Sequence, residues 1–97
     1  MLETIIMAEE VKMEYIILIS LLKQKYIGKR HCPVKNAIKG IPSHDLKKAN
    51  TAIKNLIKNG YLTPKRTGHD IDISINPRYL KEIENIPEIK AIFNENF

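Results

Sequence analysis

Apolar residues recur at helical spacing in the first quarter of the chain. Their steps of three or four residues match one face of an α-helix, and further isoleucines widen the stripe. We predict a helix over residues 8–24, buried at the centre of the domain and ended by Gly28. The members of the stripe are Val11, Tyr15, Leu18, Leu22 and Tyr26.

Proline, serine and glycine divide the following stretch into two more helices. Pro33 is expected to open a short helix over residues 34–39, as proline does at a first helical position. After a turn, Ser43 is expected to cap a longer helix over residues 44–59, because a serine hydroxyl can accept a bond from the first free amides. Gly60 is expected to end that helix.

After residue 60 the apolar period changes from helical to alternating. Residues 61–66 and 69–75 are predicted to be strands of a β-hairpin with Gly68 in its turn. Pro64 has no amide hydrogen, so its strand should lie at a sheet edge. The set expected to face inward is Ile71, Ile73 and Ile75, and the set expected to face outward is Asp70, Asp72 and Ser74.

The last part of the chain predicts helices again. Asn76 and Pro77 provide an N-cap and a first helical position for a helix to about residue 85, and Pro87 starts or kinks another. The 97 residues are expected to form one domain. Its class is predicted to be mostly helical α+β, with a core over 8–77, a hairpin over 61–76 and a helical extension over 77–94.

Charge is segregated along the chain. Residues 23–66 hold twelve of the sixteen Lys and Arg but only one of the eleven Asp and Glu, within a formal net charge of +5. Placed on the predicted helix 44–59, the basic residues fall opposite its apolar arc, where no acid lies. A solvated helix face usually mixes both signs. This face therefore indicates a polyanionic partner, and its residues are Lys47, Lys48, Thr51, Lys54, Asn55 and Lys58.

The order helix, helix, turn, helix, hairpin, helix resembles the winged helix-turn-helix DNA-binding family, in particular its small archaeal members. The most diagnostic segment is the end of the third helix and the start of the hairpin. It contains Ala49, Ile53, Leu56, Ile57, Gly60, Tyr61 and Leu62. The resemblance implies a three-helix core with a two-stranded wing, and a third helix that enters the major groove.

The roles within the third helix are divided by side-chain chemistry. Lysines at its margins are expected to contact phosphate: Lys47, Lys48 and Lys58. Near the centre of the outward face, Thr51, Lys54 and Asn55 are expected to reach base edges, since an amide pairs with adenine and an ammonium with guanine. Ser43 and His44, in the turn before the helix, are expected beside phosphate.

Two further basic clusters extend this surface. Lys65 and Arg66 are expected at the hairpin tip, on phosphate or the minor groove, although Asp70 and Asp72 would limit that contact unless lysines or Arg78 pair with them. The second cluster surrounds the start of the short helix, where a helix N-terminus can hold phosphate. It consists of Lys25, Lys29, Arg30 and Lys35.

Other classes of function find little support. The single cysteine, Cys32, excludes an intrachain disulfide and favours a reducing, cytoplasmic setting. No leader or membrane-spanning run is predicted. The histidines and Cys32 match no zinc spacing, and no nucleophile with an orienting base is evident. We expect no catalytic activity, metal or cofactor.

The sequence thus predicts sequence-specific binding of duplex DNA by a transcriptional regulator. Two alternatives use the same basic face: binding of structured RNA or a ribonucleoprotein, and docking of an acidic protein partner. Apolar residues in 2–7 and 83–93 could form a homodimer interface or simply pack onto the domain's own core.

Overall fold

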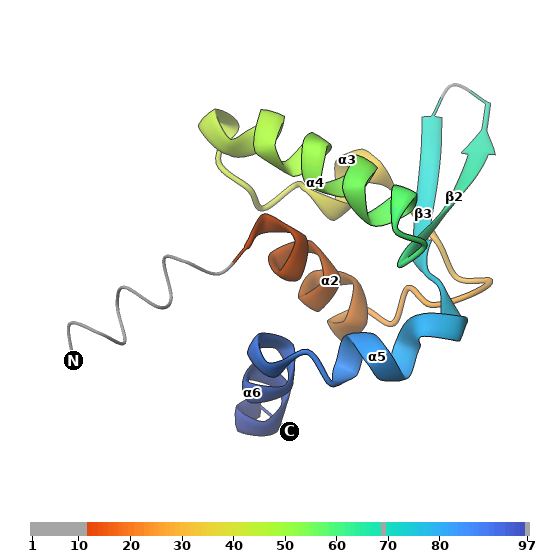
Figure 1. Ribbon diagram of the computed structural model, residues 1–97. Helices are drawn as coiled ribbons and strands as arrows, with labels where there is room; N and C mark the ends of the chain where they lie inside the picture. The colour runs from red at the N-terminus through yellow and green to blue at the C-terminus, as the bar shows by residue number, and fades with distance from the viewer. Residues whose placement is uncertain (1–11, 69, 97) are drawn as a thin grey trace.

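The computed structural model describes residues 12–68 and 70–96, with side chains as far as residue 92. This part is a small α+β fold with five α-helices and a three-stranded antiparallel sheet (Figure 1), so the predicted class is confirmed. The helices are α2 (Met13–Lys23), α3 (Val34–Ala37), α4 (Leu46–Lys58), α5 (Leu80–Glu84) and α6 (Pro87–Asn96), and the strands are β1 (Cys32–Pro33), β2 (Leu62–Thr67) and β3 (Asp70–Ile75). The 3-10 segments are η1 (Ser43–Asp45) and η2 (Pro77–Tyr79).

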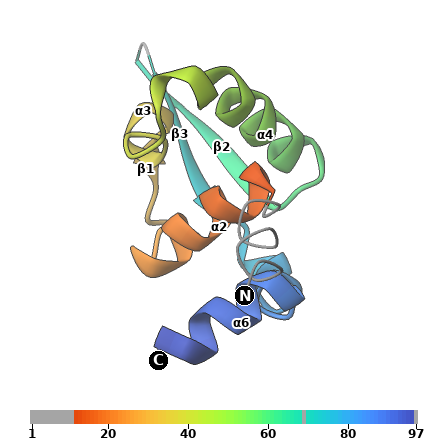
Figure 2. The ribbon, with the colours of Figure 1, turned by 90° about the vertical axis from the view of Figure 1, so that its left-hand side faces the viewer.

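Helix α2 is the centre of the core, as its wide apolar stripe predicted. It lies between α4 on one side and α5 and α6 on the other (Figures 1 and 2). A helix with apolar partners on both sides buries more than one face, which explains why the stripe is so wide. The buried residues of α2 are Ile17, Leu18, Ile19, Leu21 and Leu22.

Both ends of α2 differ from the predicted range of 8–24. Lys12 is extended, so the helix begins at Met13. The helix ends at Lys23, and Lys25, with φ of 60°, forms its stop. Gly28 is also left-handed, with φ of 65°, but it lies beyond the stop. The Lys25 amide bonds to Leu22 O and the next amide bonds to Leu21 O, which is the pattern of a Schellman stop. Gly28 instead donates its amide to Ile75 O at 3.0 Å, and thereby joins the loop to the sheet.

Helix α4 begins later than predicted and ends where predicted. Ser43 opens η1, and its side chain makes no capping hydrogen bond, so the expected Ser43 N-cap is wrong. At the other end Gly60 has φ of +86°, its amide bonds to Ile57 O, and the Tyr61 amide bonds to Leu56 O. This Schellman stop turns the chain from α4 directly into β2.

The sheet has the strand order β1-β3-β2, and β1 was missed by the sequence reading. In β1, Cys32 lies opposite Ile73 and Pro33 opposite Asp72. Strand β2 is an edge strand, as Pro64 predicted, and pairs with β3 from Leu62–Ile75 to Thr67–Asp70.

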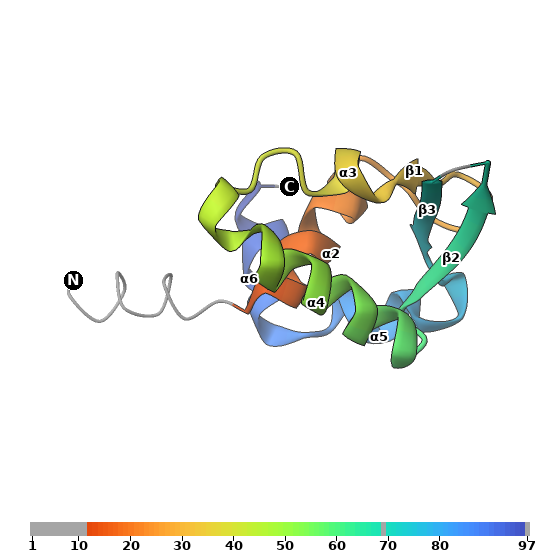
Figure 3. The ribbon, with the colours of Figure 1, turned by 90° about the horizontal axis from the view of Figure 1, so that it is seen from above.

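The predicted burial of β3 is correct at three of its six positions and wrong at three. Asp70 is exposed, as predicted. Ile73 and Ile75 are buried, but Ile71 is 44% exposed because it extends beyond the core toward the hairpin tip. Asp72 and Ser74 were expected to face solvent and are 8% and 3% exposed. Their side of the hairpin is covered by the loop that leads to β1, which lies on the opposite side from α3 and α4 (Figure 3).

The C-terminal helices belong to the core. Asn76 caps η2, since its Oδ1 accepts from the Arg78 amide at 3.0 Å, as predicted. Ile83 and Ile89 are fully buried and α6 contacts α2. Residues 2–7, the other segment proposed for a dimer interface, lie outside the described residues. No helix in the described part is both long and apolar enough to cross a membrane.

Candidate nucleic-acid interface

Helix α4 presents one buried side and one side that is entirely polar. Ala49, Ala52, Ile53 and Leu56 are buried. Leu46 is 36% exposed because it starts the helix beyond the core. All six residues predicted for the outward face are exposed. The helix contains no Asp or Glu.

The lysines of α4 have no acidic partners. Among the ion pairs of the described residues, the only lysine is Lys35 of α3. The four α4 lysines therefore present their full charge to solvent. These lysines are Lys47, Lys48, Lys54 and Lys58.

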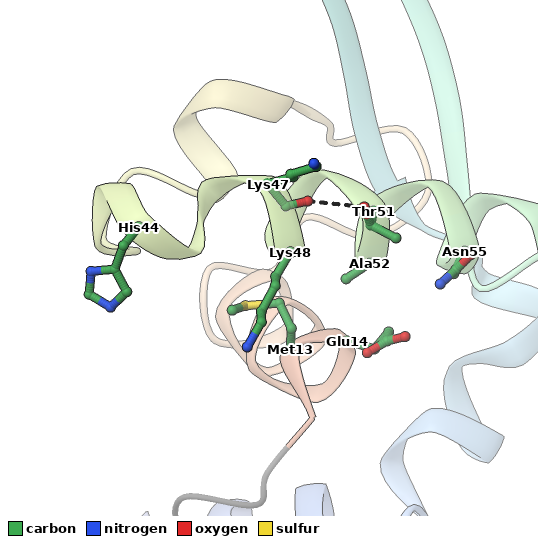
Figure 4. Close-up of a pocket in the computed structure, with 8 residues that line it drawn as sticks. All are labelled: Met13, Glu14, His44, Lys47, Lys48, Thr51, Ala52 and Asn55. Carbon is green, nitrogen blue, oxygen red and sulfur yellow. Dashed lines mark hydrogen bonds between the residues drawn. The ribbon is translucent and has the colours of Figure 1, made fainter.

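The outward face of α4 turns toward α2 at one margin. Lys47 lies on the side of α4 away from α2, whereas Lys48 extends toward Met13 (Figure 4). An open groove of about 560 Å³ lies along this margin. Glu14 is the one acidic residue in its lining, and sequence reasoning did not place it there. From α4 and η1 the groove is lined by His44, Lys47, Lys48, Thr51, Ala52 and Asn55, and from α2 by Met13 and Glu14.

Hydrogen bonds within α4 determine which polar groups remain free. Thr51 Oγ1 donates to Lys47 O at 3.0 Å, so the hydroxyl oxygen can still accept a bond and the methyl group is available. Asn50 Nδ2 donates to Leu46 O at 2.9 Å, which leaves its Oδ1 free. The Asn55 side chain makes no hydrogen bond within the described residues, so both its donor and its acceptor are available.

Asn50 is a polar residue of this surface that the sequence reading missed. It lines a second groove of about 320 Å³, between α3, α4 and the tip of the hairpin, together with Lys35 and Ile71. On a helical wheel Asn50 falls 40° from Lys54. From this small angle the sequence could have placed Asn50 on the outward face.

The turn before α4 carries a weak contact of its own. His44 is exposed, and its Nε2 lies 3.4 Å from Asp45 Oδ2. Asp45 partly offsets the positive charge at this end of α4. His44 nevertheless lines the α2–α4 groove beside Lys48, where the sequence predicted a phosphate neighbour.

Lys65 and Arg66 do not form a single basic tip. They are consecutive in a strand, so they lie on opposite faces of the hairpin. Arg66 pairs in register with Ile71, on the face of α3 and α4, whereas Lys65 pairs with Asp72 on the loop side. Only Arg66 therefore shares a face of the hairpin with α4.

Both hairpin acids have a side-chain partner within the domain. Asp70 Oδ2 lies 3.7 Å from Lys35 Nζ, as one predicted alternative required. Asp72 Oδ2 lies 2.5 Å from His31 Nδ1, and its Oδ1 accepts from Thr67 at 3.4 Å. The expectation that Asp72 faces outward is wrong, because the β1 loop covers it. Arg78 takes no part in these pairs.

The basic cluster predicted around the short helix is divided among three places. Lys35 pairs with Asp70, the Arg30 guanidinium lies 5.2 Å from the Tyr26 ring centroid, and Lys29 lines a pocket with His31 and Lys65. The structure does not bring these residues together at the start of α3. Helix α3 has only four residues, which gives its N-terminus little dipole.

Cys32 has the properties of a buried structural thiol. It is 3% exposed, in strand β1. Burial, and secondarily the nearby Asp72 carboxylate, raise the pKa of Cys32 above its ordinary value of 9.0. A thiol that stays protonated is a poor nucleophile. Within the described residues, no group of three or more His, Cys, Asp or Glu could hold a metal ion.

Comparison of the chain with family models, with curated proteins and with solved structures finds no match.

Proposed function

We propose that this chain is a winged helix-turn-helix protein that binds double-stranded DNA sequence-specifically, as a transcriptional regulator. The observation that carries the proposal is the charge on α4. Four lysines lie on one side of a helix without acids, and none of them has an ion-pair partner in the described part of the chain. Repulsion among them disfavours the helix, and a phosphate backbone would relieve it.

The dimensions of α4 suit this role. Thirteen residues give a helix ~20 Å long, and the major groove of B-DNA, ~12 Å wide, admits an α-helix. In this arrangement Lys47, Lys48 and Lys58 contact phosphate. Lys54 donates to guanine and Asn55 pairs with adenine.

The hydrogen bonds of α4 refine the base contacts. Because the Thr51 hydroxyl proton is already donated to Lys47 O, Thr51 can accept a bond from a base amino group or place its methyl against thymine. On the hairpin, Arg66 is the side chain that contacts the same duplex, since it lies on the hairpin face that is turned toward α4.

Selection from a pool of random duplexes tests sequence specificity directly. We expect an enriched motif of several base pairs. A pool without any enriched motif would contradict sequence-specific binding.

Competition between the selected duplex and an RNA duplex of the same sequence tests the type of nucleic acid. We expect DNA to compete at least ~10-fold better, because the major groove of A-form RNA is too deep and narrow for side chains to read. Equal or better competition by RNA would replace the DNA proposal with the structured-RNA alternative.

A further inference from the structure

A pocket on the loop side of the hairpin takes no part in the proposed duplex contact of α4. It holds about 450 Å³, and its lining comes from β2, β3 and the loop that leads to β1. Helices α3 and α4 lie on the other side of the hairpin (Figure 3). Its lining residues are Gly28, Lys29, His31, Thr63, Lys65 and Ser74.

The Ser74 hydroxyl is a buried polar group in the lining of this pocket. The residue is 3% exposed, in the central strand β3. Within the described residues its hydroxyl makes no hydrogen bond. No side-chain oxygen or nitrogen there is both fully enclosed and unbonded, so the hydroxyl must open to this pocket. A buried hydroxyl that reaches a pocket without a protein partner is available to a ligand.

Positive charge surrounds the same pocket. Neither Lys29 nor Lys65 has an ion-pair partner among the described residues. The one acid nearby, Asp72, is not part of the lining, and its oxygens are held by His31 and Thr67. Because His31 Nδ1 faces Asp72, the other ring nitrogen of His31 is left for the pocket.

We propose that this pocket binds a phosphate group. Lys29 and Lys65 supply charge, and the hydroxyls of Ser74 and Thr63 supply neutral donors, a set that matches the several acceptor oxygens of a phosphate. The phosphate belongs either to a nucleic-acid backbone or to a small phosphomonoester. The site does not require α4 to bind duplex DNA, so the two proposals can fail separately.

An NMR titration of the whole chain with inorganic phosphate, at constant ionic strength, tests the pocket. Saturable shifts should centre on the amides of residues 28–31, 63–65 and 72–74. The Lys29→Ala/Lys65→Ala variant should weaken binding at least ~10-fold and Ser74→Ala about threefold. The matched variant Lys81→Ala/Lys90→Ala, which removes the same charge from α5 and α6, should leave binding unchanged. Shifts that do not saturate, or that persist equally in Lys29→Ala/Lys65→Ala, would overturn the proposal.

The source of the phosphate is read from two further titrations of the same variants. If it is a backbone phosphate, Lys29→Ala/Lys65→Ala lowers duplex affinity and reduces the salt slope, log K against log salt, by about 2. If it is a phosphomonoester, glycerol phosphate saturates the pocket while duplex affinity of that variant is unchanged. Either result supports the site, and the absence of both overturns it.

Discussion

The outward face of α4 and the β2–β3 hairpin carry their charges in opposite ways. On α4 the lysines have no acidic partners in the described structure. On the hairpin both acids are paired, Asp72 with His31 at 2.5 Å and Asp70 with Lys35 at 3.7 Å. The net charge of +5 is a sum over the whole chain, so it does not distinguish these two regions.

This difference indicates which charges are available to a partner. The acids of the hairpin were expected to repel a polyanion, but each has a side-chain partner nearby, and Asp72 is 8% exposed. The lysines of α4 are uncompensated and exposed. We therefore expect a partner of negative charge to meet α4 first. On the hairpin, Arg66 lies on the face toward α3 and α4.

The largest expected effect comes from removing the uncompensated charge. The triple variant Lys47→Ala/Lys48→Ala/Lys58→Ala should lower duplex affinity by about 10²–10³-fold near 0.1 M salt and flatten the salt slope by about 2.7. Fluorescence anisotropy over a salt series measures both quantities. Circular dichroism should show that helix content is unchanged, since alanine is a better helix former than lysine. An unchanged salt slope would mean that these lysines do not contact phosphate.

The next effect tests the turn at Gly60, which connects α4 to the hairpin. In Gly60→Ala the residue must keep φ of +86°, and its Cβ would lie 3.2 Å from Tyr79 Cε2. We expect a loss of about 2 kcal/mol in the free energy of unfolding, measured with urea. Gly40→Ala is the matched control, because nothing lies within 4 Å of its Cβ and its φ is not positive. A Gly60→Ala protein as stable as Gly40→Ala would contradict the tight turn.

A smaller effect tests the two acidic pairs of the hairpin. His31→Ala would leave the buried Asp72 carboxylate without its main partner, and should cost about 1–2 kcal/mol of unfolding free energy. Lys35→Ala removes the other hairpin pair, whose side chains are 74% and 54% exposed, and should cost no more than about 0.5 kcal/mol. Equal losses in the two variants would show that the buried His31–Asp72 pair contributes no more to stability than the exposed Lys35–Asp70 pair.

The smallest effect is a dependence of stability on alkaline pH. Since the pKa of Cys32 is raised in the fold, its stabilising contribution is complete below the ordinary value of 9.0 and is lost as pH rises above it. Urea unfolding at about pH 8 and pH 10 should show a smaller alkaline loss in Cys32→Ala than in the wild type. Part of the loss should remain, because the hydrogen bond to Glu82 also raises the pKa of Tyr61. Tyr61→Phe should remove that part, and identical slopes in all three proteins would contradict the prediction.

Features fixed by local chemistry could be predicted from the sequence. The Gly60 stop, the Asn76 cap and the apolar stripe of α2 depend on residues within a few positions of one another. All six residues predicted for the outward face of α4 are exposed, because a strict period of 3.6 separates its lysines from Ala49, Ile53 and Leu56. Asn50 was missed.

Features fixed by distant contacts could not be predicted. Strand β1 has only two residues, and it is a strand because it pairs with β3 some forty residues later. The same pairing covers Asp72 and Ser74, which alternation alone placed in solvent. Lys25 adopts a left-handed conformation that its residue type disfavours, so no local signal could have moved the helix stop from Gly28.

The central claim is tested most directly by the variant Lys54→Ala/Asn55→Ala, measured against the selected duplex and a scrambled one. Its matched control is Lys81→Ala/Asn85→Ala, the same two residue types on and just after α5, away from α4. We predict that Lys54→Ala/Asn55→Ala loses at least ~10-fold of the discrimination between the two duplexes while the control keeps it. Full affinity and full discrimination in Lys54→Ala/Asn55→Ala would contradict base recognition by α4.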